Sequence, residues 1–162
     1  MVMRSYLKRA ALKIQEIELT IDHGSIFGYV VDATEPNIQT YLMQYTNLGK
    51  SIAGRLAQRS EVVALLRNLY VDFEHRGQGI GSELVSSFLQ EAEQAGATCY
   101  VLLSDYGEEQ INNLDLKAWY EKFGFTGVLG TESGPLMVMP DSIAEDLTDF
   151  LGPQDEDPDF YP

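Results

Sequence analysis

A short glycine-rich stretch between an apolar run and an amphipathic helix places the strongest constraint on the fold of this chain. Residues 76–81 read Arg-Gly-Gln-Gly-Ile-Gly, follow a β-rich run over 62–71 and precede a helical pattern over 81–95. A chain that turns through glycines into a helix leaves backbone N–H groups unpaired at the positive end of the helix dipole. Glycine lets a diphosphate approach the backbone, and Arg76 adds a fixed positive charge. The stretch therefore predicts a site for a phosphorylated cofactor.

Two common nucleotide motifs fail on particular residues. A dinucleotide fingerprint needs a third glycine where Ser82 stands, and it needs an acidic residue about twenty positions further on, where Cys99 and Tyr100 stand. Residues 49–51, Gly-Lys-Ser, match the end of a triphosphate-binding loop, but Gln44 occupies the position of its first glycine. The sequence excludes both motifs.

Residues 65–81 fit a different pattern, R/Q-x-x-G-x-G/A, through Arg76, Gly79 and Gly81. This stretch resembles the coenzyme A signature of the GNAT N-acetyltransferase superfamily. Residues 113–125 are similar to a later motif of that family, N-x-x-A-x-x-[FL]-Y-x-x-x-G-F, although Leu116 and Trp119 replace the usual smaller residues. The order and separation of the two segments agree with the family, and the chain is identified as a member.

The resemblance implies that the protein uses acetyl-CoA. It places the pantetheine arm beside the backbone of residues 69–71 and the diphosphate on residues 76–82. The cofactor-binding residues expected from the two motifs are Leu69, Tyr70, Val71, Arg76, Gly77, Gln78, Gly79, Ile80, Gly81, Ser82 and Asn113.

Catalytic roles follow from the same resemblance and from the chemistry of acetyl transfer. Asn113 lies seven residues before Tyr120, close to two helical turns, so both side chains face one side of a helix. By family analogy Tyr120 is the general acid beside the sulfur. An attacking amine must lose a proton, and Asp105, at the end of the run over 98–103, is the leading candidate for the base, with Glu108 and Glu109 behind it.

The acceptor is expected to be a small cationic amine. Residues 104–109 are similar to an Asp-Tyr-Gly-acid-acid segment of GNAT aminoglycoside 3-N-acetyltransferases, and a formal net charge of −14 concentrates cations near the protein. An alternative enzyme function is acetylation of a protein N-terminus, a lysine or an aminoacyl-tRNA. A third possibility, from another class, is a non-catalytic GNAT-fold interaction protein that uses its acidic C-terminus.

Composition limits the domain count and the partners. A chain of 162 residues predicts one domain over 1–152, followed by an acidic tail over 153–162 that is expected to be disordered. The chain has no apolar run long enough to span a membrane and no secretory signal, which predicts a cytoplasmic protein. The sequence is compatible with a monomer or a homodimer.

Charge and histidine placement argue against two further kinds of partner. The net charge of −14 disfavours nucleic acid held on a basic surface. His23 and His75 are expected to form no cluster with each other or with Cys99, a thiol expected to be buried in a strand, so no metal site is predicted.

The hydrophobic pattern predicts a mixed α+β protein with the GNAT fold. In that fold a central, mostly antiparallel, twisted sheet splays at the cofactor cleft, and helices cover both faces. Where the family usually has two helices after its first strand, the N-terminal part here reads as unusually β-rich. The expected strands cover 12–21, 26–31, 38–45, 51–57, 62–71, 98–103, 125–129 and 135–139. The expected helices cover 81–95, 113–123 and about 142–151, the last opened by a capping box from Ser142 to Glu145, and Gly124 is expected to cap the second.

Overall fold

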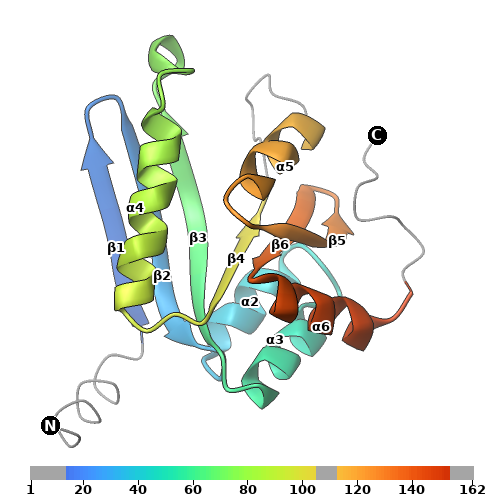
Figure 1. Ribbon diagram of the computed structural model, residues 1–162. Coiled ribbons are helices and arrows are strands. Elements are labelled where there is room, and N and C mark those ends of the chain that lie inside the picture. Colours follow the sequence, from blue (N-terminus) through green and yellow to red (C-terminus); the bar gives the residue numbers. More distant parts are fainter. Residues whose placement is uncertain (1–13, 105–112, 154–162) are drawn as a thin grey trace, which may run out of the picture.

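The described part of the protein is built on one six-stranded sheet with helices on both faces (Figure 1). The computed structural model describes residues 14–104 and 113–153. The spatial order of the strands is β1-β2-β3-β4-β6-β5, and β3 and β4 make the one parallel pair among the described strands. The strands are β1 (Ile14–Ile21), β2 (Gly24–Asp32), β3 (Val62–Val71), β4 (Cys99–Leu103), β5 (Thr126–Thr131) and β6 (Gly134–Met139). The expected α+β fold with a mostly antiparallel sheet is confirmed.

The helices divide between the two faces of the sheet. One buried apolar cluster joins the sheet to α2, α3 and α6, and a second joins it to α4 and α5. The helices are α2 (Pro36–Met43), α3 (Gly49–Gln58), α4 (Ile80–Gln94), α5 (Asn113–Glu121) and α6 (Asp141–Leu151), with a 3-10 turn η1 (Phe73–His75) before α4. Because each face has its own core, the sheet is buried between two layers.

The N-terminal prediction is wrong at two segments. Residues 38–45 and 51–57, expected to be strands, belong to α2 and α3, so this part of the chain is not unusually β-rich. β-Branched and aromatic residues favour a strand by propensity, but tertiary packing overrides propensity. Here Ile38, Tyr41 and Leu42 are all buried on one side of α2 at helical spacing. The two helices lie between β2 and β3.

The centre of the sheet agrees with the sequence pattern. Strand β3 occupies the expected residues 62–71, and the residues at its start are buried on both faces of the sheet. Val63 and Leu65 pack on the side of α2 and α3, whereas Ala64 and Leu66 pack on the side of α4. A strand with both faces covered reads as a continuous apolar run. The helix expected over 81–95 is α4.

The predicted helices and strands of the C-terminal part are confirmed, but the predicted cap of the last helix is not. Gly124 has φ +104 after α5, the left-handed region expected at a helix end. Helix α6 begins directly after Pro140, and no side chain caps it, so the capping box predicted at Ser142 is wrong. The reason is that Pro140 already supplies the extended conformation and the carbonyl that Ile143 and Ala144 bond to.

Two further expectations can be compared with the structure. Cys99 is a buried free thiol in β4, as expected. Within residues 14–104 and 113–153, every helix is too short or too polar to cross a membrane. The tail is predicted over 153–162, and its residues 154–162 lie outside the described residues.

Candidate functional site

Strands β3 and β4 separate part-way along their length, and we call this divergence the splay. Their pairing covers Val63–Leu66 and Cys99–Leu102, but β3 continues to Val71 with β2 as its partner. Figure 1 shows the two strands meeting at one end and diverging toward the end where α4 begins. Among the described strands, residues 67–71 have no neighbour on the side facing β4. This edge contains residues 69–71, which the sequence assigns to the pantetheine arm.

A bulge in β3 marks the start of the splay. Phe27 pairs with Asn68 and Gly28 pairs with Leu66, so Arg67 is the extra residue. A Cβ at Gly28 would lie 2.6 Å from the Phe88 ring of α4, and the close approach of strand and helix therefore requires glycine there. The bulge bends β3 at the point where its pairing with β4 ends.

The glycine-rich stretch forms the connection from η1 to α4, which we call the cradle (residues 76–82). Gly77 and Gly79 have φ of +80 and +84, and a Cβ at either position would meet nothing within 4 Å. No side chain caps α4, whose first backbone bond runs from Glu83 N–H to Gly79 O at 3.0 Å. The amides of Ile80, Gly81 and Ser82 precede that bond. Open space above uncapped amides is what a diphosphate requires, so these residues fit coenzyme A.

The two motif segments are in contact. A Cβ at Gly81 would lie 3.4 Å from the Trp119 ring, which places α5 against the first turn of α4. Trp119 is one of the two residues that depart from the family pattern, and its ring occupies the space beside this glycine. The cradle and the helix that carries Tyr120 are thus held together by a direct packing contact.

Arg76 braces the cradle. Its Nε and Nη2 atoms both donate to Val71 O at 3.3 Å, and its guanidinium lies 5.3 Å from the Phe73 ring centre. Phe73 is 77% exposed, so this contact lies on the surface. Arg76 therefore ties the end of β3 to the loop that enters the cradle, which adds a structural role to the phosphate contact expected from the sequence.

Tyr120 is buried in the core on the α4 side of the sheet. Its ring makes edge contacts with Trp119 at 5.0 Å and Phe125 at 6.1 Å between centroids, and 5% of the residue is exposed. Burial raises the pKa of its hydroxyl to about 12. A phenol with this pKa is protonated at neutral pH and can act only as a hydrogen-bond donor or weak acid.

The acidic residues considered as the base differ in whether the structure describes them. Asp105, Glu108 and Glu109 lie outside the described residues, and so does the side chain of Asn113, although Asn113 begins α5. Glu61, the acidic residue just before β3, is buried and accepts hydrogen bonds from Thr98 Oγ1 at 2.6 Å and Arg59 Nε at 3.1 Å. It lies at the end of β3 opposite the splay, where it stabilises the sheet.

Two features near the site were not predicted. The expectation that the histidines stay apart is wrong, because the His23 and His75 rings stack with centroids 3.5 Å apart. Their contact joins residues 52 positions apart, which no local sequence pattern reveals. Ser104, at the end of β4, is fully buried, and its hydroxyl has no hydrogen-bond partner among the described residues.

Known structures show the same fold. The anti-CRISPR protein AcrVA5 is 17% identical, and the match covers 78% of this chain and 99% of that one with a TM-score of 0.50. An acetyltransferase from Bacillus cereus ATCC 14579 is 15% identical over 85% of this chain and 90% of its own, with a TM-score of 0.48. A mutant AtaT toxin, bound to the C-terminus of the antitoxin AtaR and to acetyl-CoA, is 16% identical over 78% of this chain and 65% of its own, with a TM-score of 0.45.

Sequence comparison settles the family. No curated protein sequence matches the chain. The family model described as acetyltransferase (GNAT) domain matches residues 22–127, which include the splay, the cradle and Tyr120. The chain therefore belongs to the GNAT family and is an acetyl-CoA-dependent N-acetyltransferase.

Proposed function

We propose that the protein moves the acetyl group of acetyl-CoA to the primary amine of a small cationic acceptor, by direct attack in a ternary complex. The observation that carries the proposal is the splay, which opens beside the cradle at one end of β3. A thioester held along β3 would reach the sheet face on which the exposed polar residues of β1–β3 lie. The proposal assigns each part of the reaction to residues of the chain.

The cradle and the edge of β3 that faces the splay would hold the cosubstrate, which supplies the acetyl thioester when bound. The backbone groups of residues 69–71 would pair with the amides of the pantetheine arm, as a neighbouring strand would. The uncapped amides of residues 80–82 would bind the diphosphate at the positive end of the α4 dipole. The family resemblance assigns a further contact with the cosubstrate to Asn113, the first residue of α5.

Tyr120 would stabilise the departing thiolate. Its pKa of about 12 exceeds that of a simple thiol, about 8.5, by about three to four units. Full proton transfer from the phenol to the thiolate would therefore be unfavourable, because it moves the proton from the weaker acid to the conjugate base of the stronger one. Donation of a hydrogen bond avoids this cost. We therefore assign Tyr120 to charge stabilisation: the phenol keeps its proton while the C–S bond breaks, and coenzyme A departs as a thiolate that takes its proton from solvent.

A row of side chains would guide a cationic acceptor to the splay. Glu18, Phe27 and Asn68 face one another across β1, β2 and β3. Their neighbours Ile17, Ile26 and Leu69 pack toward α4, and side chains alternate along strands, so the row lies on the opposite face. Glu18 and Asn68 are exposed. The row offers a carboxylate, an aromatic ring and an amide, which suit an alkylammonium or aminosugar.

Acetylation requires a neutral amine, because an ammonium nitrogen has no lone pair with which to attack. Asp105 directly follows Ser104 at the end of β4, and we propose that its carboxylate, or a water bound to it, accepts the proton. Glu108 and Glu109 are the alternatives. The assignment of Asp105, Glu108 or Glu109 as the proton acceptor rests on the sequence.

The test is release of free thiol from acetyl-CoA with a panel of acceptors. The panel contains a polyamine, an aminoglycoside, a peptide with a free N-terminus, a lysine peptide and a charged tRNA. We expect turnover to be fastest with the two polycations. Turnover confined to a peptide or tRNA would refute the acceptor class, and turnover with none of them would likewise refute a small cationic amine as the acceptor.

Two variants test the residue roles. Tyr120→Phe should keep acetyl-CoA binding and lower kcat by about ten- to a hundredfold, within the usual range for one positioned donor. Glu18 lies two strand spacings, about 10 Å, from β3, so each acceptor charge gains about 0.4 kcal/mol from it in water. Glu18→Gln should therefore raise KM about eightfold for a trication and about twofold for a monocation. Glu91→Gln, an exposed charge change on α4, is the matched control.

A further inference from the structure

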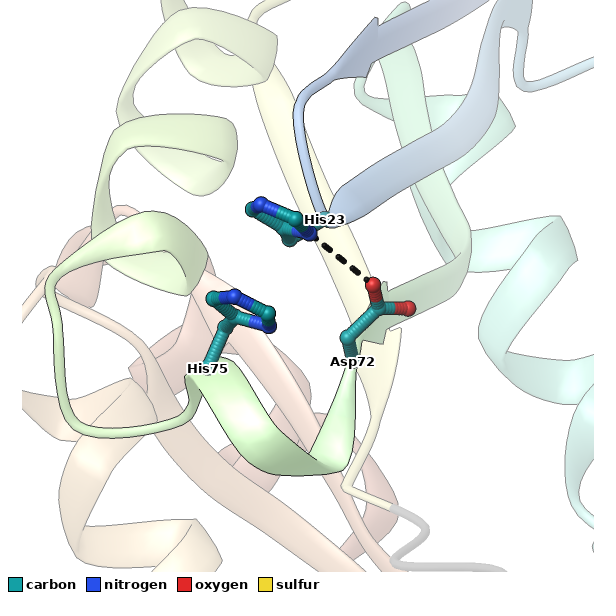
Figure 2. Close-up of side chains that lie close together, drawn as sticks. All are labelled: His23, Asp72 and His75. Carbon is teal, nitrogen blue, oxygen red and sulfur yellow. Dashed lines mark hydrogen bonds and ion pairs between the residues drawn. The ribbon is translucent and has the colours of Figure 1, made fainter.

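Three side chains from separate elements converge beside the start of α4. His23 lies in the turn between β1 and β2, Asp72 directly follows β3, and His75 ends η1. The two imidazole rings are stacked, with an interplanar angle of 5°, and His23 Nδ1 lies 3.2 Å from Asp72 Oδ2. In Figure 2 both rings turn a nitrogen toward the side on which Asp72 lies. One ligand atom from each side chain lies within 4.8 Å of the other two.

One nitrogen of this cluster lacks a partner. His75 Nδ1 is buried and makes no hydrogen bond in the part of the chain that the structure describes. Buried polar atoms are nearly always paired, so an orphaned ring nitrogen calls for a ligand or ion. His23 has φ +70, a rare conformation for a residue with a side chain, and a hydrogen bond of 2.7 Å from Asp72 N–H to His23 O holds its turn in place. The turn thus presents the imidazole to Asp72 and His75.

We propose that His23, Asp72 and His75 bind a divalent transition-metal ion, with Zn²⁺ as the best fit. Two imidazole nitrogens and one carboxylate oxygen suit zinc and its neighbours in the first row, whereas calcium and magnesium prefer oxygen ligands alone. In a tetrahedral zinc site with bonds of about 2.0–2.1 Å, ligand atoms lie about 3.3–3.4 Å apart. The separation of His23 Nδ1 and Asp72 Oδ2, 3.2 Å, already matches. The ligand atoms of all three side chains lie within 4.8 Å of one another, and the His75 ring would have to tilt out of the stack for its nitrogen to point at the same ion.

The surroundings of the cluster allow an ion to enter. The side chains of His23 and Asp72 are 45% and 40% exposed, so the site opens to solvent. Binding replaces the proton shared by His23 Nδ1 and the carboxylate, since metal ligands must be deprotonated. Three protein ligands leave the fourth tetrahedral position for water.

The ion would fasten the β1–β2 turn to the connection between β3 and α4. Gly24, next to His23, already packs there, because a Cβ at this position would lie 2.9 Å from the Ile80 side chain and 3.0 Å from Tyr70 O. Asp72 and His75 both precede the cradle. A metal bound to all three side chains would therefore hold the entrance of the cradle in shape, a structural role separate from the acetyl-transfer steps proposed above.

The test is calorimetric titration of Zn²⁺ into the metal-stripped full chain. The same site is followed with Co²⁺, whose visible absorption reports nitrogen and oxygen ligands. We expect one ion per chain. His75→Gln and His23→Asn should each weaken Zn²⁺ binding by about a hundredfold or more, since loss of a supporting residue alone costs about 10- to 100-fold. Asparagine tolerates the left-handed conformation at position 23, so that variant should keep the turn.

Glu74→Gln is the matched control, because Glu74 lies between Asp72 and His75, is exposed and is absent from the cluster. It should bind Zn²⁺ with the affinity of the unaltered protein. Circular dichroism and the acetyl-CoA thermal shift establish that each variant is folded. The proposal is overturned if the unaltered protein binds no Zn²⁺, if both histidine variants, once shown to be folded, retain its affinity, or if Glu74→Gln loses binding to the same extent as they do.

Discussion

Replacement of Gly79 separates the two properties that make the cradle a phosphate site, its backbone shape and its open space. Gly79 has φ +84, so any other residue there is strained. A Cβ would nevertheless meet nothing within 4 Å, so alanine adds strain without filling the site. Glutamate adds the same strain and also extends a negative charge into the space where the diphosphate would lie. The pair Gly79→Ala and Gly79→Glu therefore isolates the effect of charge.

The magnitudes follow from linkage between binding and folding. At a hundredfold excess over Kd, acetyl-CoA stabilises the folded state by about 2.7 kcal/mol. For a chain of this size that raises Tm by about 5–11 °C, at about 2–4 °C for each kcal/mol. Strain of about 1–2 kcal/mol lowers the Tm of both free variants by about 2–8 °C. A carboxylate about 5 Å from one phosphate charge adds a repulsion of about 3 kcal/mol at an effective dielectric of about 20.

Thermal unfolding without acetyl-CoA measures the strain in each variant. Thermal unfolding with acetyl-CoA, at one fixed ligand concentration, measures how much stabilisation by the ligand remains. Gly79→Ala should keep most of the ligand-induced shift, whereas in Gly79→Glu the shift should fall below about 2 °C, because about 3 kcal/mol removes nearly all of the linkage term. A full shift in the glutamate variant would show that the diphosphate binds elsewhere. Equal losses in both variants would show that backbone shape, and not charge, controls binding.

Three further outcomes are expected. Asp146 accepts two hydrogen bonds from Arg55, which lower the pKa of its carboxyl. Its stabilising effect is therefore fully present above the ordinary pKa of 3.8 and is lost as pH falls through the lowered value. Asp146→Asn should reduce Tm at pH 7, and the difference from the unaltered protein should shrink as pH falls below 3.8. Ser104→Ala should raise the Tm of the free protein by about 2–4 °C, because it removes a buried hydroxyl that has no hydrogen-bond partner within residues 14–104 and 113–153, and an unchanged or lower Tm would contradict this. Truncation after Gly152 should leave kcat within about twofold, since the acidic residues 153–162 follow the end of α6, and a large loss in a folded truncation would refute the tail assignment.

Local patterns predicted well the strand, the loop and the helices on which the expected cofactor-binding residues lie. The apolar run of β3, the glycines of the cradle and the spacing within α5 are all contiguous in sequence, and each specifies its conformation through its own residues. The same reasoning failed at α2. There Ile38 and Tyr41 favour a strand by propensity, and only the packing of one helical side against the sheet decides the outcome.

Long-range contacts were beyond prediction from the spacing of residues. His23 and Asp72 are 49 residues apart, and they meet because the antiparallel register of β2 and β3 brings the turn after β1 to the end of β3. The contact of Trp119 with Gly81 likewise depends on how α5 packs against α4. Such contacts arise from topology, which no single segment encodes.

The splay has a consequence for how the sheet is assembled and how it can vary. Strands β1–β3 come from residues 14–71 and strands β4–β6 from residues 99–139, so each half of the sheet is continuous in sequence. Four parallel residue pairs between β3 and β4 join the halves, and α4 is the crossover between them. Each half can therefore form its antiparallel pairs within one continuous stretch of chain before the two are joined. For the same reason, loops within one half can change in length while the register at the junction, and with it the site for the cosubstrate, stays constant.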